Sequence, residues 1–392
     1  MRILALTHQY PTPFQPTYST YNRQQFAELA ESHELRVIRP IPWTLALTQR
    51  RQGKWQGPGP LMQGRVPVTF PAFYYPPKVG SHSYGPFFEW SVRGVFRREV
   101  QAFRPDVVLA TWAHPDGWAA VRLARRESLP IIVKVTGADV LVYATGRRRP
   151  PVVEALTGAD AVVAVSEDLA SHVRALGVPA ERVHVVPEGV SASLFSPGDQ
   201  AGARARLGIQ GTGRLLLFAG SLLSSKGAFD LIEACAALRD RGVSFTCRLV
   251  GGGAEAASVT ERIQQRGLGD IVACAGSRPH EEMPDWYRAS DLVVLPTYVE
   301  GLPNTLREAI ACGRPFVATR VGGIPELASA SCSQLVTAGS VPELTNALQQ
   351  MLVAPPRVDA SISAATSGSW KDSASRLADV LQSATSARSS RR

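Results

Sequence analysis

The sequence predicts an α/β protein with two domains, each built on an open, doubly wound parallel sheet. A chain of 392 residues is too long for one ordinary hydrophobic core and long enough for two. Short stretches rich in Val and Ile alternate with helical stretches, and their near-continuous apolarity is typical of parallel strands buried on both faces. This alternation restarts after a segment rich in Gly and Pro at 195–213, which we interpret as a linker.

Six strands are expected in the first half of the chain. They lie at 2–7, 35–40, 106–111, 131–136, 161–166 and 183–188. Helical stretches fall between them, and in the stretch 21–31 the side chains of Phe26 and Leu29 share one face. We interpret the N-terminal MRILALTHQYP as the first strand rather than a signal peptide, because His8 and Gln9 follow the apolar run without a small-residue cleavage site.

Five more strands are expected in the second half, with helices between them. The strands lie at 214–221, 245–252, 271–276, 292–297 and 315–320, and the helices at about 227–241, 255–267, 281–290 and 303–312. The amphipathic stretch 370–384 predicts a final helix after a tail rich in Ser and Ala. We therefore expect domains at 1–195 and 196–365, with ligands at the carboxyl edges of the two sheets and a cleft between them.

Composition excludes several classes of protein. The net charge of +9 suits nucleic acid, an anionic membrane face or phosphorylated ligands. No zinc-finger, basic-zipper or aromatic–basic RNA motif accompanies the charge, so we expect no nucleic-acid partner; a nucleic-acid binder is an alternative that rests on charge alone. The five cysteines show no C-x-x-C spacing, which argues against a disulfide framework or a zinc site and favours a reducing cytosol.

Two loops that follow strands carry unusual residues. In GSLLSSKG, Gly220 permits close backbone approach, and Lys226 stands where a helix begins, although its charge has the wrong sign for the helix dipole. An anion bound by both the lysine and the helix would explain this placement; a solvated surface lysine is the alternative. The stretch LVGGGAEAA matches the dinucleotide fingerprint only formally, and we interpret its Gly251 as part of a tight turn at the ligand edge.

The stretch EGLPNTLREAIACG, from Glu300 to Gly313, predicts a helix without a side-chain cap. Pro303 suits the first helical position and Gly313 the position past the end, but no Ser, Thr or Asp stands at the N-cap. A phosphate oxygen could accept the hydrogen bonds of the first N–H groups, and Glu308 could accept ribose hydroxyls. The alternatives are a surface glutamate and N–H groups bonded to water.

These residues together resemble glycosyltransferase family 4. The resemblance rests on the two glutamates of EGLPNTLRE, the following AIACGRPFVATRVGGIPEL and the upstream GSLLSSKG, and it covers nearly the whole chain. It implies the GT-B fold, with two Rossmann-like domains, and a retaining, metal-independent enzyme. The N-terminal domain would be the acceptor side, the C-terminal domain would bind the donor, and the helix at 370–384 would pack back on the N-terminal domain. The pattern is most similar to enzymes of cell-surface polysaccharide or teichuronic-acid synthesis.

The resemblance also implies roles for individual residues. Lys226 would bind the diphosphate of a UDP- or GDP-hexose, Glu308 the ribose, and Glu300 the transferred hexose near the reacting face. The backbone of Gly301, Leu302, Pro303, Asn304 and Thr305 would hold the diphosphate and sugar, and Gly220, Ser221, Gly251, Ser277 and Arg278 would complete the donor site. No cofactor and no metal is expected, because the nucleotide sugar is a co-substrate.

The sequence departs from the family pattern at four places. Ser221 stands where an arginine is frequent, Glu188 where an asparagine is usual, and Ser19 where a glycine is common. Thr136 replaces the histidine that contacts the donor sugar. His114 is a candidate substitute for this histidine. Asp139, which follows Thr136 and Gly137, is a candidate catalytic carboxylate.

The segment 43–95 combines aromatic residues with Arg, Lys and Pro. Its aromatic residues include Trp43, Trp55, Phe70, Phe73, Tyr74, Tyr75, Phe87, Phe88 and Trp90. Such a segment suits lipid headgroups or a polyprenyl-linked acceptor, and equally loops and helices packed on the first sheet. The sequence thus predicts a cytoplasmic hexosyltransferase, with reversible docking on the inner face of the membrane as a further hypothesis. The alternative is a catalytically weakened partner subunit that binds sugar nucleotides.

Overall fold

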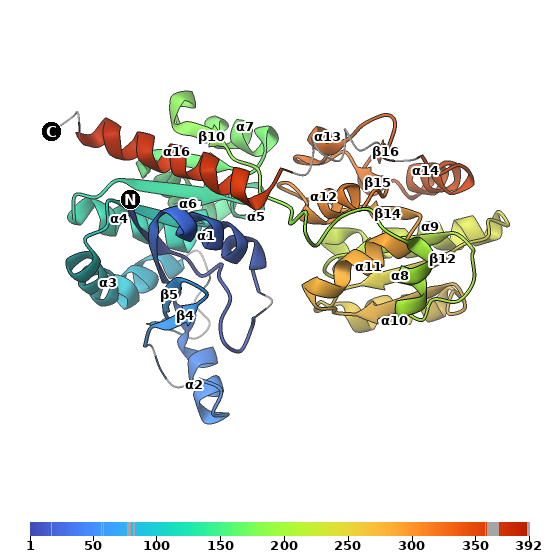
Figure 1. Ribbon diagram of the computed structural model, residues 1–392, viewed down its shortest axis with the longest axis horizontal. Helices are drawn as coiled ribbons and strands as arrows, with labels where there is room; N and C mark the ends of the chain where they lie inside the picture. Colours follow the sequence, from blue (N-terminus) through green and yellow to red (C-terminus); the bar gives the residue numbers. More distant parts are fainter. Residues whose placement is uncertain are drawn as a thin grey trace. The chain divides into compact units, whose positions relative to one another are not determined.

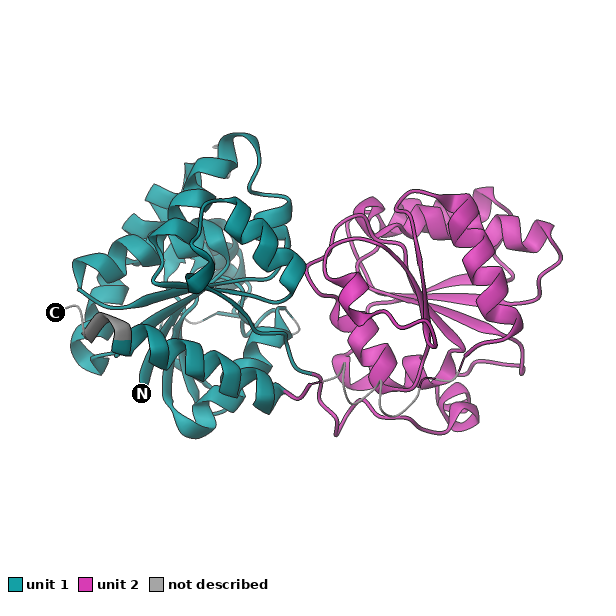
Figure 2. Ribbon diagram, turned by 90° about the horizontal axis from the view of Figure 1, so that it is seen from above, with its two compact units in different colours: residues 1–189, 370–392 teal, residues 190–369 magenta. Residues whose placement is uncertain are grey.

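The chain divides into two compact units (Figure 2). The computed structural model describes residues 1–16, 18–55, 57, 59–76, 80, 83–356, 358 and 368–389. Unit 1 comprises Met1–Gly189 and Trp370–Arg392, and unit 2 comprises Val190–Ser369. The division therefore falls after Gly189 rather than after residue 195, and the expected domain end at 365 lies outside the described residues.

Unit 1 is built on an eight-stranded sheet in the order β10-β9-β8-β7-β1-β2-β5-β4. Figure 1 labels β10 from one end of this order and β5 and β4 from the other. Its strands are β1 (Arg2–Leu6), β2 (Glu34–Ile38), β4 (Leu61–Gln63), β5 (Val66–Thr69), β7 (Val107–Thr111), β8 (Ile131–Val135), β9 (Ala161–Ala164) and β10 (Val183–Val185). Neighbouring strands are parallel except for the antiparallel pair β4 and β5. A separate two-stranded sheet joins β3 (Ile41–Pro42) to β6 (Ala72–Phe73).

Helices cover the sheet of unit 1. They are α1 (Thr20–Ser32), α2 (Trp43–Arg51), α3 (Tyr84–Phe103), α4 (Trp118–Arg126), α5 (Ala138–Leu141), α6 (Arg149–Gly158), α7 (Glu167–Ala175) and α16 (Trp370–Ser389), with short helical turns η2 (Ala113–Gly117), η3 (Gly146–Arg148) and η4 (Ala180–Arg182). The α16 side chains Leu377 and Leu381 are fully buried in the core formed with Phe26 and Ile132. Hydrophobic burial thus holds the C-terminal helix on the first unit, as predicted.

The six strands predicted for the first half are all present, but the segment 41–73 contains four short strands that were not predicted. Pro67 interrupts the apolar pattern of β5, and a proline argues against an inner strand because it lacks an N–H to donate. In the structure Val68 and Thr69 of β5 pair with Val37 and Ile38 of β2. Pro67 precedes both paired residues and lies outside this part of the ladder. The 43–95 segment is therefore partly an extension of the sheet.

Unit 2 is a six-stranded parallel sheet in the order β13-β12-β11-β14-β15-β16. Its strands are β11 (Leu215–Ala219), β12 (Thr246–Val250), β13 (Val272–Gly276), β14 (Leu292–Leu295), β15 (Phe316–Thr319) and β16 (Ser333–Val336). Its helices are α8 (Gln200–Arg206), α9 (Ala228–Asp240), α10 (Ala256–Gln265), α11 (Met283–Ala289), α12 (Asn304–Ala311), α13 (Ile324–Leu327) and α14 (Val341–Val353), with turns η5 (Ser224–Lys226) and η6 (His280–Glu282). The five predicted strands are confirmed, and β16 was not predicted.

Each main sheet contains a point where the strand order reverses. In unit 1, β2 lies on one side of β1 and β7 lies on its other side, and later strands continue beyond β7. In unit 2, β12 and β14 flank β11 in the same way, so the corresponding neighbours are β11 and β14. Loops that leave such a pair of strands diverge, so a crevice opens at their carboxyl ends, and ligands bind there in open α/β sheets. The two switch points, β1/β7 and β11/β14, are therefore the first places to look for a functional site.

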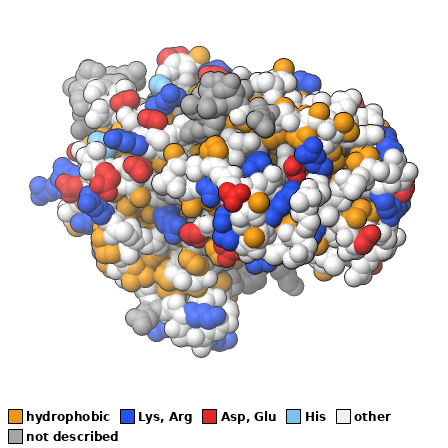
Figure 3. All heavy atoms as spheres, turned by 45° about the vertical axis from the view of Figure 1, so that its right-hand side comes forward, with side chains coloured by type: hydrophobic (Ala, Val, Ile, Leu, Met, Phe, Trp, Pro, Cys, Tyr) orange, Lys and Arg blue, Asp and Glu red, His pale blue; other side chains and the backbone are white. Residues whose placement is uncertain are grey.

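Surface charge and helix composition add two observations. On the face shown in Figure 3, Lys and Arg side chains are spread among acidic ones rather than gathered into one patch. Within the described part of the chain, no helix has the length and apolarity needed to cross a bilayer.

Candidate functional site

The β11/β14 switch point of unit 2 is walled by glycine-rich backbone. The Gly220 N–H donates to Val250 O over 3.0 Å, and the Leu222 N–H donates to Gly252 O over 2.8 Å. Gly251 has φ +150°, and a Cβ there would collide with Gly220 O. The turns after β11 and β12 are therefore in direct backbone contact, which requires glycine and explains the GGG sequence without a dinucleotide fingerprint.

Lys226 and Glu300 meet across this switch point. Lys226 ends η5 after β11, Glu300 follows β14, and the Lys226 Nζ lies 2.5 Å from Glu300 Oε1. Both side chains keep some exposure, 28% for Lys226 and 16% for Glu300. The two loops are also joined by the Tyr298 N–H, which donates to Ser225 O over 2.9 Å. The structure thus brings the two predicted residues together as one ion pair.

The helix α12 begins beside this pair without a side-chain cap, as predicted. Pro303 occupies the N-cap position rather than the first helical one, and its side chain offers no hydrogen-bond acceptor. The Thr305 Oγ1 donates to Ala219 O over 3.1 Å, which ties the first turn of α12 to the end of β11. The N-terminus of α12 and the Lys226 ammonium therefore lie at the same switch point, where both favour an anion.

Glu308 lies on α12 with its carboxyl held by a tyrosine. The Tyr287 Oη donates to Glu308 Oε2 over 2.8 Å. Burial of the carboxyl raises the pKa of Glu308 to about 7, although the Tyr287 hydrogen bond opposes this shift. Near neutral pH this carboxyl therefore exists in both protonation states.

The remaining donor-site candidates follow the neighbouring strands. Ser277 and Arg278 come after β13 and are exposed, and the Arg278 Nε donates to Ala275 O over 3.1 Å. A Cβ at Gly252 would lie 2.5 Å from the Ser277 Oγ, so the loops after β12 and β13 are also in contact. Gly322, with φ +52°, lies against Glu300 O and supports the loop that carries the glutamate. Apart from His114 and Asp139, the predicted site residues thus lie along one edge of unit 2.

His114 and Asp139 lie in unit 1, after β7 and β8. Asp139 is fully buried, and its carboxylate accepts N–H hydrogen bonds from Thr136, Gly137 and Ala113 at 2.9–3.2 Å. Burial raises the pKa of Asp139 to about 6, and these hydrogen bonds oppose the shift. His114 is 8% exposed and packs against Gly85 of α3, where a Cβ would lie 3.0 Å from its Nε2. This geometry makes Asp139 a link between two loops and places His114 against a helix.

A second pair, which was not predicted from the sequence, lies at the β1/β7 switch point of unit 1. His8 follows β1 and Asp116 lies in η2 after β7, with His8 Nδ1 2.5 Å from Asp116 Oδ2. The Asp116 side chain has no exposed surface, whereas the His8 side chain is 29% exposed. The only sequence signal was that both residues follow predicted strands, and that signal did not identify those strands as neighbours.

Glu188 has a clear partner in the same unit. The Lys134 side chain on β8 is completely buried, and its Nζ lies 3.2 Å from Glu188 Oε1 and 2.8 Å from Gln25 Oε1. A buried ammonium needs such partners because removing it from water is costly. Glu188, which stands where the family usually has an asparagine, is therefore paired with a buried lysine.

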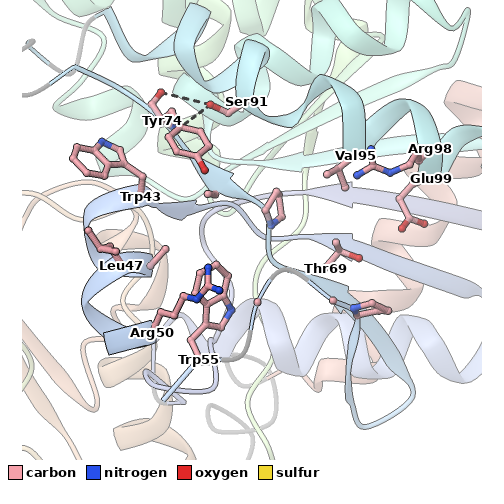
Figure 4. A pocket seen from close by; sticks show the side chains of 16 residues that line it. Trp43, Leu47, Arg50, Trp55, Thr69, Tyr74, Ser91, Val95, Arg98 and Glu99 are labelled. Atoms are coloured by element: carbon pink, nitrogen blue, oxygen red, sulfur yellow. Dashed lines mark hydrogen bonds between the residues drawn. The ribbon is translucent and has the colours of Figure 1, made fainter. Parts of the chain in front are cut away.

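A groove of about 800 Å³ lies on unit 1 among α2, α3 and the loop after β6 (Figure 4). Its labelled lining includes Trp43, Leu47, Arg50, Trp55, Tyr74 and Arg98. The Ser91 Oγ accepts the Tyr74 N–H over 2.9 Å, which holds that loop against α3. Trp43, Trp55 and Tyr74 of the aromatic segment are thus gathered around one groove with two arginines.

No group of three or more His, Cys, Asp or Glu side chains is placed to hold a metal ion in the part of the chain that the structure describes.

Comparisons with known proteins identify the family of the chain. Residues 17–189 match the family model described as "Glycosyl transferase 4-like domain", and residues 199–367 match "Glycosyl transferases group 1". The chain is 31% identical over 322 residues to a D-inositol 3-phosphate glycosyltransferase of Nocardiopsis dassonvillei, covering 75% of each chain. It is 29% identical over 338 residues to a putative teichuronic acid biosynthesis glycosyltransferase of Bacillus subtilis, covering 83% of each. A further relative, D-inositol 3-phosphate glycosyltransferase 1 of Catenulispora acidiphila, is 35% identical, but the match spans 57% of its length.

Solved structures share the fold over the whole chain. The structure of Anabaena HepE in complex with UDP has a TM-score of 0.76 at 19% identity, covering 98% of this chain and 100% of that chain. The sucrose-phosphate synthase of Thermosynechococcus elongatus has a TM-score of 0.74 at 20% identity, covering 100% and 98%. The predicted GT-B fold is confirmed.

Proposed function

This chain belongs to the family of glycosyl transferases group 1, and we propose that it moves a hexose from a UDP- or GDP-sugar to a hydroxyl of a glycan or lipid-linked acceptor. The observation that carries the proposal is the Lys226–Glu300 pair beside the uncapped start of α12. A cation and a helix N-terminus at one switch point suit a diphosphate. The similarity in fold to HepE, whose structure is in complex with UDP, supports a nucleotide-sugar donor.

Each donor group has a proposed partner in unit 2. Lys226 and the backbone of Gly301–Thr305 hold the diphosphate, and Glu308, with its carboxyl fixed by Tyr287, accepts the ribose hydroxyls. Ser277 and Arg278 border the nucleobase, and Glu300 faces the hexose. When the diphosphate arrives, it replaces part of the Lys226–Glu300 contact, so the carboxylate is released toward the sugar hydroxyls.

The proposed reaction retains configuration and takes place on one face of the sugar. The bond between the anomeric carbon and the diphosphate oxygen breaks, the bond to the acceptor oxygen forms, and the acceptor proton passes to the leaving diphosphate. Lys226 and the α12 N-terminus stabilise the charge that develops on that diphosphate, and such stabilisation is usually the largest catalytic contribution. In this proposal Lys226 and the α12 N-terminus supply the opposing positive charge, without a metal ion or cofactor.

The acceptor side is proposed to be unit 1, in cell-surface polysaccharide or glycolipid synthesis at the cytoplasmic face of the membrane. The groove of Figure 4 supports a lipid-linked acceptor or a lipid surface, because aromatic side chains line it together with Arg50 and Arg98. Flotation with phosphatidylglycerol liposomes tests this part. We expect binding at low salt, and an Arg50→Ala variant about fivefold weaker, since one basic side chain contributes about 1 kcal/mol near an anionic surface. Absence of binding at low salt would contradict it.

The first experiment is a thermal-shift screen of UDP- and GDP-sugars followed by product analysis. We expect one nucleotide class to raise the melting temperature and to support transfer with retention. A second candidate function, a partner subunit that binds sugar nucleotides without turning them over, is favoured by Thr136 and Ser221, which replace family side chains. Stabilisation by a donor without hydrolysis or transfer would support that candidate, and no stabilisation by any donor would exclude both.

A further inference from the structure

The β1/β7 switch point of unit 1 carries a polar network that the donor site does not use. His8 lies after β1 and Asp116 after β7, so the pair occupies in unit 1 the place that Lys226 and Glu300 occupy in unit 2. Asp116 accepts two hydrogen bonds from His8, one from its backbone N–H and one from its Nδ1, both 2.5 Å long. The Asp116 side chain has no exposed surface, so His8 is oriented by a buried carboxylate.

The hydrogen bonds of this network run in one direction. The hydroxyls of Ser19 and Tyr21 donate to Gln9 Oε1, over 2.6 and 3.1 Å, which fixes the orientation of the Gln9 amide. The Gln9 Nε2 then donates to His8 Nε2 over 2.8 Å. Since a carboxylate only accepts, His8 carries its hydrogen on Nδ1 and presents Nε2 as an acceptor.

The backbone around the pair is held in unusual conformations. Trp112 has φ +105°, its N–H donates to Lys134 O over 2.8 Å, and its ring meets the His8 ring edge-on at 5.7 Å. Ser19 has φ +49°, which explains why a glycine is common there. Non-glycine residues at positive φ are costly, and such strain clusters at functional sites.

We infer that His8 Nε2 accepts a hydrogen bond from a hydroxyl of the acceptor sugar, with Asp116 as the positioning residue that fixes the imidazole. A partly exposed imidazole oriented by a buried carboxylate is the arrangement used to present Nε2 to a substrate hydroxyl. Its present partner, the Gln9 amide, is a neutral donor, and a sugar hydroxyl is a neutral donor that takes its place. The inference rests on the proposed function, because it assigns the acceptor to unit 1.

The test uses the full chain, the donor found by thermal shift, and octyl β-glucoside and octyl β-galactoside as acceptor probes. Asp116→Asn keeps the side-chain volume and an oxygen that accepts the backbone N–H of His8. Its amide nitrogen, however, donates to His8 Nδ1, so the ring hydrogen moves to Nε2. We expect kcat/KM for the acceptor to fall about 10–100-fold, as for other substitutions of residues that orient a ligand. Donor hydrolysis in the absence of acceptor and the thermal shift by donor are expected to stay unchanged.

Variants at His8 separate binding from folding. His8→Ala is expected to lose transfer to the same extent, and His8→Gln to regain part of it, because the glutamine Oε1 lies near the position of Nε2 and accepts the same hydrogen bond. His172→Gln, at an exposed histidine on α7, is the matched control and should behave as wild type. If Asp116→Asn transfers normally, or if donor hydrolysis falls as much as transfer, the inference is wrong. A wild type that hydrolyses the donor but transfers to neither probe overturns the acceptor assignment, and one that turns over no donor overturns the proposed function.

Discussion

The two switch points are lined by different parts of the chain. In unit 2 the crevice is walled by backbone: Gly251 touches Gly220 O, and α12 begins without a side-chain cap. In unit 1 the corresponding crevice is filled by side chains, with the His8–Asp116 pair joined to Gln9. Backbone N–H groups and a lysine favour an anion, whereas an imidazole held by a carboxylate and an amide can exchange hydrogen bonds with hydroxyls. This difference is the reason why we propose unit 2 for the donor and unit 1 for the acceptor.

If the unit 2 crevice acts through charge, removing its lysine should have the largest effect on turnover. Lys226→Ala is expected to lower kcat roughly 10²–10³-fold, as loss of one group that stabilises developing negative charge does. Steady-state kinetics with the donor at saturation measures this, and circular dichroism checks the fold. Lys371→Ala, at an exposed lysine on α16, is the control. A Lys226→Ala variant with wild-type kcat would remove the basis for an anion site there.

Unit 1 also contains the buried Lys134–Glu188 ion pair, and breaking this pair should destabilise the fold. Lys134→Met leaves Glu188 buried without its cation, and we expect a loss of about 3–5 kcal/mol in the free energy of unfolding. Denaturant titration measures it. The double variant Lys134→Met with Glu188→Gln should recover most of the loss, because the buried carboxylate charge is removed together with the ammonium. Equal stability of the single and double variants would show that the pair is not coupled.

If close backbone contact builds the unit 2 crevice, one added methyl group should damage it. Gly251→Ala forces a Cβ onto Gly220 O at a φ of +150°, so we expect a loss of about 1–3 kcal/mol in the free energy of unfolding. Gly269→Ala is the matched control, since a Cβ there meets no atom within 4 Å, and it should change stability by less than about 0.5 kcal/mol. Similar values for the two variants would mean that the loops move apart readily.

The last expected effect is a pH dependence of stability that Glu308 gives to unit 2. Its pKa is raised from 4.5 to about 7 by burial, so between these values the folded chain holds a proton that the unfolded chain has released. This contribution to stability is full below pH 4.5 and is lost as pH rises through about 7. Melting curves at pH 5 and pH 8 should show that Glu308→Gln removes this part of the decline. If Glu308→Gln leaves the difference in melting temperature between pH 5 and pH 8 unchanged, another group causes that difference.

Much of unit 2 was predictable because its signals are local in sequence. Continuous apolar runs predicted β11 to β15, and the EGLPNTLREAIACG stretch predicted an uncapped α12 with Gly313 past its end, where φ is +73°. These signals need no knowledge of distant partners, because a buried strand and a missing cap are properties of a few consecutive residues. In contrast, β5 escaped prediction because Pro67 is acceptable only given the register that β2 provides.

The sequence by itself determined the two α/β domains and the residue types that follow each strand. Only the tertiary structure decided which of those side chains meet. Lys226 meets Glu300 across 74 positions and His8 meets Asp116 across 108, because the strand order places β11 beside β14 and β1 beside β7. The same effect places His114 against Gly85 and buries Asp139, two residues that the sequence had offered as catalytic candidates. Residue type is local, but partnership and burial depend on which strands become neighbours.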